Sequence, residues 1–260
     1  MHTNVNDTNY SYIGIIMLAC LFAPVFVYAS VDSDADGLSD EQEIVYQTDP
    51  HNPDTDGDGY KDGEEVEYDY SPLLGEGKHM NESDADKDGL NDWLERWFGS
   101  DMGKTDSDGD GFPDYDEVMK GYSPASTTST RLFDRKVVVD RTEQRLNFYV
   151  DGVKIHNFPA STGNPGTPTP DGEYHMMRKV AKKSYVGPGY DLPGVTWNVE
   201  FSPMYYIHTA YWHNDFGKRT HSHGCVNLRE DDAKVIYEYI DETVPIVVTG
   251  ETPAGFVVGT

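Results

Sequence analysis

A thiol with several imidazoles close to it in the sequence is the most reactive cluster of the chain. Cys225 follows Gly224 directly, and His208, His221 and His223 are nearby. A cysteine nucleophile needs a neighbouring base or cation to form thiolate near neutral pH. It also needs backbone N–H groups that face a developing oxyanion, and a glycine allows the close approach. These residues indicate covalent catalysis by Cys225, but their order alone does not say which histidine is the base.

Two other interpretations of Cys225 remain open. The only other cysteine is Cys20, so an exported chain that had lost its N-terminal segment would carry an unpaired thiol. Free cysteines are often small buried hydrophobic residues. The thiol and the three histidines could instead bind zinc, but His-x-His-x-Cys is crowded on one loop and lacks the usual spacing of zinc ligands.

Two motifs give the second half of the chain a specific resemblance. His208 is followed, after thirteen residues, by Ser222-His223-Gly224-Cys225-Val226-Asn227. Upstream are Ser161-Thr162-Gly163 and Thr169-Pro170-Asp171-Gly172-Glu173-Tyr174. In this order, over roughly residues 131–249, the motifs resemble the L,D-transpeptidase (YkuD-type) catalytic domain. The resemblance implies a mostly β, β-sandwich-like fold with the cysteine at the end of a cleft.

The resemblance also implies a role for each matched residue. Cys225 would be the nucleophile and His208 the general base, oriented by the backbone carbonyl of Thr209. His223 would shape the site, and the N–H groups of Gly224 and Cys225 would form the oxyanion hole. Some family members carry arginine two places after the cysteine, where this chain has asparagine. The candidates for substrate contacts are Ser222, Asn227, Tyr206, Tyr211, Trp212 and Arg229, with Arg219 and Lys218 as further carboxylate-binding candidates.

The usual reaction of that family is acyl transfer on peptidoglycan stem peptides, without a catalytic cofactor. The thiolate attacks the carbonyl of the third stem residue, D-alanine leaves, and the acyl group passes to an acceptor. The acceptor can be an amine of another stem, a lysine of an envelope protein, or water. We therefore predict a cell-wall transpeptidase sensitive to carbapenems. The alternatives are an L,D-carboxypeptidase or hydrolase of the same stems, and a non-catalytic, calcium-dependent wall-binding scaffold.

The first half of the chain carries most of the negative charge. The formal net charge is -26, and residues 31–122 hold 29 acidic against 6 basic side chains. This balance excludes a generally basic nucleic-acid-binding protein. So many uncompensated charges repel one another unless cations neutralise them. A solvated, disordered acidic segment is the alternative.

Four twelve-residue loops repeat inside this segment, and they start at Asp32, Asp54, Asp84 and Asp106. Oxygen-bearing residues occupy positions 1, 3, 5 and 9, glycine occupies position 6, and glutamate occupies position 12, as in calcium-binding loops. The starts lie 22, 30 and 22 residues apart, so a pair of loops repeats every 52 residues. This spacing leaves too little chain for two long helices per loop. The tandem loops resemble thrombospondin type 3 repeats.

We expect each loop to bind structural Ca2+, a hard cation that takes six to eight oxygen ligands. The resemblance implies a compact stalk with little hydrophobic core, in which Trp93, Trp97 and Phe98 are anchors. The predicted ligands include the backbone carbonyl at position 7 of each loop. They are Asp32, Asp34, Asp36, Leu38, Asp40, Glu43, Asp54, Asp56, Asp58, Tyr60, Asp62, Glu65, Asp84, Asp86, Asp88, Leu90, Asp92, Glu95, Asp106, Asp108, Asp110, Phe112, Asp114 and Glu117.

An apolar run from Ile13 to Tyr28 resembles a secretory signal with cleavage after Ala29, although no Lys or Arg precedes it. The run is short for a membrane span. We predict export to the periplasm, the cell envelope or the extracellular space. The main alternative is an uncleaved membrane anchor; cleavage as a lipoprotein before Cys20 is disfavoured by the apolar residues that follow.

The predicted elements must position these groups. We expect a signal over residues 1–29, repeats over 31–122, a Ser/Thr-rich linker over 123–130, the catalytic domain over 131–250 and a tail over 251–260. One amphipathic helix is predicted from Glu230 to about Thr243. A hairpin turn is predicted at Asp151-Gly152. Strands are predicted over 137–139, 146–150, 154–158, 197–201, 205–208 and 245–249.

Overall fold

The computed structural model of the chain describes residues 30–75, 77–187 and 189–254. The predicted signal segment and its Cys20 lie outside this range, as does most of the predicted tail. Within the described residues, no helix is both long enough and apolar enough to cross a membrane.

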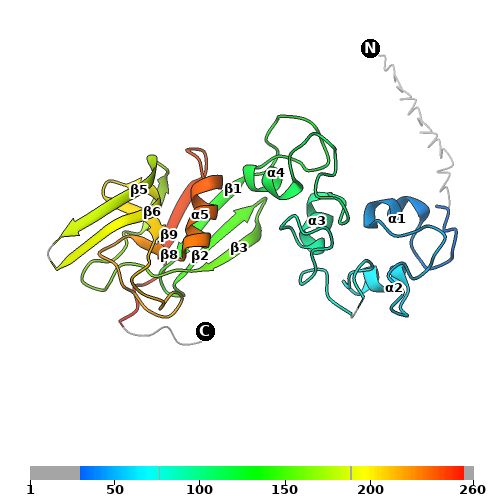
Figure 1. Ribbon diagram of the computed structural model, residues 1–260, viewed down its shortest axis with the longest axis horizontal. Helices are drawn as coiled ribbons and strands as arrows, with labels where there is room; N and C mark the ends of the chain where they lie inside the picture. Colours follow the sequence, from blue (N-terminus) through cyan, green and yellow to red (C-terminus); the bar gives the residue numbers. More distant parts are fainter. Residues whose placement is uncertain (1–29, 76, 188, 255–260) are drawn as a thin grey trace, which may run out of the picture. The chain divides into compact units, whose positions relative to one another are not determined.

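Each acidic loop leads into one short helix that begins at position 9 of the loop (Figure 1). Acidic residues fill the first turn of each helix, where the helix dipole favours negative charge. The glutamate at position 12 therefore lies within that first turn. The helices are α1 (Asp40–Tyr46), α2 (Asp62–Glu67), α3 (Asp92–Phe98) and α4 (Asp114–Lys120).

The loops associate in pairs. The backbone N–H of Gly63 in the second loop donates to Asp36 Oδ2 in the first loop at 2.9 Å. The backbone N–H of Tyr115 in the fourth loop donates to Asp88 Oδ2 in the third loop at 2.9 Å. Both bonds join position 10 of one loop to position 5 of the loop before it. The 52-residue period in the sequence is therefore the period of a structural pair.

The repeats contain more hydrophobic packing than expected. Leu38, Val66 and Met80 form a small hydrophobic cluster. Phe98 is buried in the larger core, which it shares with residues of the β-rich part. Trp93 packs against both clusters. The prediction for Trp97 is wrong, because its side chain is 54% exposed and only stacks on Trp93.

The β-rich part consists of two sheets and one helix (Figure 1). The five-stranded sheet has the order β3-β2-β1-β9-β4, in which β1 and β9 are parallel and the other pairs antiparallel. Its strands are β1 (Arg135–Asp140), β2 (Arg145–Val150), β3 (Val153–Pro159), β4 (Gly172–His175) and β9 (Pro245–Thr249).

The second sheet has four strands in the order β5-β6-β7-β8. A long antiparallel hairpin, β5–β6, forms one side, and β7 and β8 pair in parallel. Helix α5 (Glu230–Tyr239) packs its buried face, Ala233 and Ile236, against β6, β7 and β8. The strands are β5 (Arg178–Gly187), β6 (Tyr190–Ser202), β7 (Tyr205–Thr209) and β8 (Val226–Leu228).

The prediction of a mostly β catalytic domain with one main helix is confirmed. All six predicted strands and the turn at residues 151–152 are present. The predicted end of the helix near Thr243 is wrong. The helix ends at Tyr239 because Ile240 is extended and the Asp241 carboxylate accepts hydrogen bonds from the backbone N–H and hydroxyl of Thr243, which forms a turn instead. Strands β4, β5 and β8 were not predicted.

The fourth repeat packs directly against the β-rich part. The Tyr115 hydroxyl and His156 Nε2 form a hydrogen bond of 2.8 Å. The Tyr239 hydroxyl donates to the Asp116 carboxylate, and Arg135 Nη1 donates to the carbonyl of Met119 at 3.3 Å. Burial lowers the pKa of His156 to about 4, so the imidazole is neutral at this contact near pH 7. Polar and aromatic contacts thus connect α4 to β3, β1 and α5.

The contact between α4 and α5 gives a test of stability. Tyr239→Phe removes a hydrogen bond to a charged acceptor and should lower the free energy of unfolding by about 1–2 kcal/mol. Tyr237→Phe is the matched control, because no described group hydrogen-bonds to the Tyr237 hydroxyl on the same helix. Urea denaturation in calcium-containing buffer measures both. Equal unfolding free energies for the two variants would contradict the contact.

Candidate active site

The parallel pairing of β7 with β8 brings the segment with His208 and the segment that follows Cys225 together. In this register His208 lies opposite Asn227, and Ile207 lies opposite Val226. Side chains alternate along a strand, so Ile207 enters the hydrophobic core while His208 takes the opposite face. Cys225 immediately precedes β8, and it lines the same cavity as His208.

The orientation of His208 is fixed by the backbone. Its Nδ1 lies 2.8 Å from the carbonyl oxygen of Thr209. A carbonyl can only accept, so Nδ1 carries the proton and Nε2 is the basic nitrogen. The imidazole is 3% exposed, and the ring of Tyr185 lies 5.0 Å from it. The structure therefore contains the contact with Thr209 that the sequence resemblance implied.

A short polar loop shapes the backbone around the thiol. Ser222 Oγ donates to the carbonyl of Cys225 at 2.6 Å and accepts from the N–H of Gly224 at 3.0 Å. Gly224 has φ +117°, and an added Cβ would lie 2.4 Å from the Tyr205 ring, so only glycine fits. The Gly224 N–H thus already bonds to Ser222 Oγ, and its expected place in an oxyanion hole stays a prediction. The Cys225 N–H makes no hydrogen bond to any described residue.

The upstream motif packs and hydrogen-bonds against this loop. Ser161 and Asn227 exchange two backbone hydrogen bonds of 2.9 Å, and Asn164 N–H donates to the Ser222 carbonyl at 2.9 Å. At Gly163 an added Cβ would lie 2.8 Å from the Gly224 Cα. The second motif therefore acts through close backbone packing against the cysteine loop.

Burial keeps the Cys225 thiol and the His208 imidazole neutral at pH 7. It raises the pKa of the Cys225 thiol to about 11, despite opposing effects of the Tyr206 backbone and Lys183. It lowers the pKa of His208 to about 4, although the bond to the Thr209 carbonyl acts the other way. At pH 7 the resting site therefore holds a thiol and a neutral imidazole.

A cavity of about 250 Å³ opens over these groups. Ser222, His223 and Trp212 line it together with the catalytic pair and Asn227. Sequence reasoning missed the lining residues Tyr185, Tyr190 and Leu192 of the β5–β6 hairpin. Tyr190 stacks on His223 with ring centroids 5.2 Å apart. An alternating strand pattern could have indicated β5, but its many lysines concealed it.

Three predicted pocket residues lie elsewhere. Tyr206 is fully buried beneath the site. Tyr211 is 57% exposed, and its hydroxyl donates to the Pro193 carbonyl at 2.9 Å. The Arg229 guanidinium lies over the Phe216 ring, 5.8 Å from its centroid. None of the three lines the cavity.

His213 and His221 form a network with Asn227. Asn227 Nδ2 lies 3.2 Å from His213 Nε2, and the rings of His213 and His221 stack with centroids 4.2 Å apart. His221 Nε2 lies 2.6 Å from Asp215 Oδ2. Burial lowers the pKa of His213 to about 4, and His221 acts in the same direction. Among the described residues, no potential metal-binding group includes Cys225 or any of these histidines, so the geometry gives the zinc interpretation no support.

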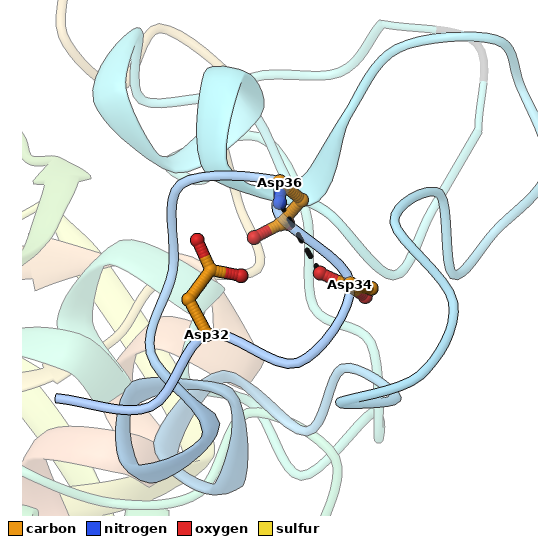
Figure 2. Close-up of side chains that lie close together, drawn as sticks. All are labelled: Asp32, Asp34 and Asp36. Atoms are coloured by element: carbon orange, nitrogen blue, oxygen red, sulfur yellow. Dashed lines mark hydrogen bonds between the residues drawn. The ribbon is translucent and has the colours of Figure 1, made fainter.

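The acidic loops bring their first three aspartates together. In each loop the carboxylates at positions 1, 3 and 5 lie within 4.8 Å of one another; Figure 2 shows Asp32, Asp34 and Asp36 of the first loop. The position-9 aspartates instead accept hydrogen bonds from the start of their own loop, as Asp62 does from Thr55. Carboxylate oxygens of Asp62, Asp36 and Glu43 also lie within 4.8 Å of one another. This cluster contains residues of both the first and the second loop.

Carboxylates at positions 3 and 12 keep buried oxygens without hydrogen bonds in all four loops. At positions 3 and 12, at least one carboxylate oxygen is buried without a hydrogen bond. Burial, followed by repulsion from neighbouring carboxylates, raises the pKa of Glu95 to about 10 and that of Glu65 to about 8. Such groups are costly unless a cation pairs with them. The residues with these oxygens are Asp34, Glu43, Asp56, Glu65, Asp86, Glu95, Asp108 and Glu117.

Comparison with known families identifies both parts. Residues 134–248 match the L,D-transpeptidase catalytic domain (YkuD). Residues 32–53, 54–68 and 106–121 match the bacterial TSP3 repeat. The chain therefore contains an L,D-transpeptidase catalytic domain preceded by TSP3 repeats.

Two curated proteins and one solved structure are similar to part of the chain. The chain is 35% identical over 115 residues to the probable L,D-transpeptidase 3 of Mycobacterium tuberculosis. The matched segment covers 40% of this chain and 41% of that protein. It is 34% identical over 116 residues to L,D-transpeptidase 1 of the same species, covering 38% and 44%. The chain thus spans less than half the length of these curated relatives. A solved L,D-transpeptidase from Mycobacterium smegmatis has a TM-score of 0.43 at 29% identity, covering 45% of this chain and 59% of that one.

The neutral resting pair predicts how Cys225 responds to pH. Because its pKa is raised to about 11, the thiolate fraction is small at pH 7. Alkylation by iodoacetamide should therefore accelerate about ten-fold per pH unit between pH 7 and 10. Intact mass of the chain from residue 31 onward, measured against time, gives the rate, and Cys225→Ala, which then carries no thiol, is the unreactive control. A rate that is already constant above pH 7 would contradict the neutral pair.

Proposed function

We propose that this protein cross-links peptidoglycan as an L,D-transpeptidase through a thioester on Cys225. One observation supports the proposal above all others. The His208 imidazole is held by the Thr209 carbonyl with Nε2 as its basic nitrogen, and it lines the same cavity as the thiol. This is the nucleophile–base–orienting group arrangement of cysteine acyltransfer.

In the first half-reaction His208 Nε2 takes the thiol proton as Cys225 Sγ attacks the carbonyl of the third stem residue. The carbon–nitrogen bond to D-alanine then breaks, and the imidazolium returns the proton to the leaving amine. In the second half-reaction Nε2 takes a proton from the acceptor amine, which attacks the thioester. The carbon–sulfur bond breaks, and Sγ regains its proton.

The charge that develops on the substrate oxygen needs a donor near the sulfur. The Cys225 N–H is available, since it makes no hydrogen bond to the described residues. The Gly224 N–H is held by Ser222 Oγ and contributes by shaping the loop. We assign the oxyanion contact at this position to the Cys225 amide.

For the repeats we propose structural Ca2+. The cluster of three aspartates and the orphaned glutamate oxygen of each loop supply hard oxygen ligands, as calcium requires. The bound ion would cancel the repulsion among these buried carboxylates. The ordered repeats would then form a spacer between the envelope and the catalytic domain of an exported protein.

The acyl-enzyme proposal is tested by intact mass. The chain from residue 31 onward is incubated with a tetrapeptide stem or with a carbapenem. We expect one covalent adduct per chain, with release of D-alanine from the peptide, and no adduct on Cys225→Ala. His208→Gln should slow acylation by about 10²–10⁴-fold, because the base is lost. Addition of an acceptor amine then distinguishes transpeptidation from hydrolysis. A parent protein without any adduct in calcium-containing buffer would contradict the proposal.

The calcium proposal predicts that Glu95→Gln changes the stability of the protein in opposite directions in EDTA and in calcium. Glu95→Gln replaces a buried carboxyl group whose two oxygens lack hydrogen bonds. In EDTA at pH 7 the variant should be more stable than the parent, because the parent carboxyl, whose pKa is raised to about 10, must take up a proton when the chain folds. In calcium it should be less stable and bind its ion about ten-fold more weakly or worse, because a bidentate ligand is lost. Thermal unfolding and calorimetric titration measure both effects. Glu82→Gln, which changes an exposed residue before the loop, is the control; a Glu95→Gln variant that behaves like this control would refute the proposal.

A further inference from the structure

Lys183 lies beside the catalytic groups, and the catalytic steps above do not use it. It precedes Tyr185 by two residues on β5, and its Nζ lies 3.9 Å from the centroid of the Tyr206 ring and 4.8 Å from that of Tyr185. Tyr185 lines the cavity, and its ring lies 5.0 Å from His208. The ammonium is thus held on an aromatic platform at the border of the active site.

No described carboxylate forms an ion pair with Lys183. The nearby cation Arg178 differs in this respect, because its guanidinium pairs with Glu200 and donates to the Tyr206 hydroxyl at 3.0 Å. Arg229 is directed to Phe216 and lies outside the cavity lining. The described lining of the cavity contains no Lys or Arg, and Lys183 borders it through the ring of Tyr185 without an ion-pair partner of its own among the described residues.

This charge does little for the proton transfer itself. Lys183 lowers the pKa of the Cys225 thiol and also that of the His208 imidazole. Transfer of the proton from Sγ to Nε2 creates one negative and one positive charge. The stabilisation of the thiolate is therefore offset by destabilisation of the imidazolium. A group that gains fully from Lys183 is an anion that enters the site from outside.

The proposed donor carries such an anion at the required place. A stem tetrapeptide ends one residue beyond the attacked carbonyl, so its terminal carboxylate lies within about 3.6 Å of chain length from the reacting carbon. We propose that Lys183 binds the terminal carboxylate of the donor stem peptide. The inference rests on the proposed function and deepens it by naming the residue that selects an unblocked tetrapeptide. It also identifies a carboxylate-binding cation in place of Arg229, Arg219 and Lys218.

The test compares a tetrapeptide with a free C-terminus and the same peptide with a C-terminal amide. The parent protein should acylate with the free acid about ten-fold more efficiently, mainly through KM. Lys183→Met should lose this preference, and Lys183→Arg should keep most of it. Lys182→Met is the matched control, because the exposed Lys182 is the adjacent cation and its stem lies over Gly194. Release of D-alanine or D-alaninamide measures the rates, and thermal unfolding checks that each variant is folded.

The outcomes separate the two proposals. If Lys183→Met still prefers the free acid as the parent does, the assignment of Lys183 is wrong while the acyl-enzyme mechanism stands. If the parent acylates the acid and the amide equally, terminal carboxylate recognition is likewise refuted. If the folded parent forms no acyl-enzyme with either peptide, the proposed function fails and the Lys183 assignment fails with it.

Discussion

The parallel pairing of β7 and β8 is the constraint on which the active site depends. It places His208 opposite Asn227 and so fixes the position of Cys225 one residue before β8. A shift of one residue would turn His208 into the core and Ile207 into the cavity, since side chains alternate along a strand. The hydrophobic core behind the sheet, which includes Ile207, Val226 and Ile236, therefore stabilises the catalytic register as well as the fold.

Burial links this site to the acidic repeats through a common physical effect. In the candidate active site it keeps the Cys225 thiol and the His208 imidazole neutral at pH 7. In the repeats it holds several carboxylates where their charge is unfavourable without a cation. The two regions also touch, through Tyr115 with His156 and Tyr239 with Asp116. Calcium in the fourth loop would thus act on a helix, α4, that packs directly against the catalytic domain.

Prediction from the sequence succeeded where local chemistry is decisive. The loop pattern of alternating aspartates fixed the three-carboxylate clusters, and the hydrophobic strands around Val137 and Phe148 were correctly identified. It failed where distant contacts override local preference. The helix from Glu230 stops at Tyr239 because Asp241 binds Arg131 and Arg135 and caps a turn. The lysine-rich β5 forms only because β6 pairs with it.

The sequence by itself supplied the candidate groups for the chemistry: the thiol of Cys225, its preceding glycine and the repeated carboxylates. Their types and spacing suffice because these motifs act through short stretches of backbone. Only the tertiary structure decided which imidazole is oriented by a backbone carbonyl inside the cavity that the thiol lines, that the Gly224 amide is already bonded to Ser222, and that Lys183 lies over Tyr206. These relations join residues on different strands, and their distances are set by sheet register and core packing, which no local pattern encodes.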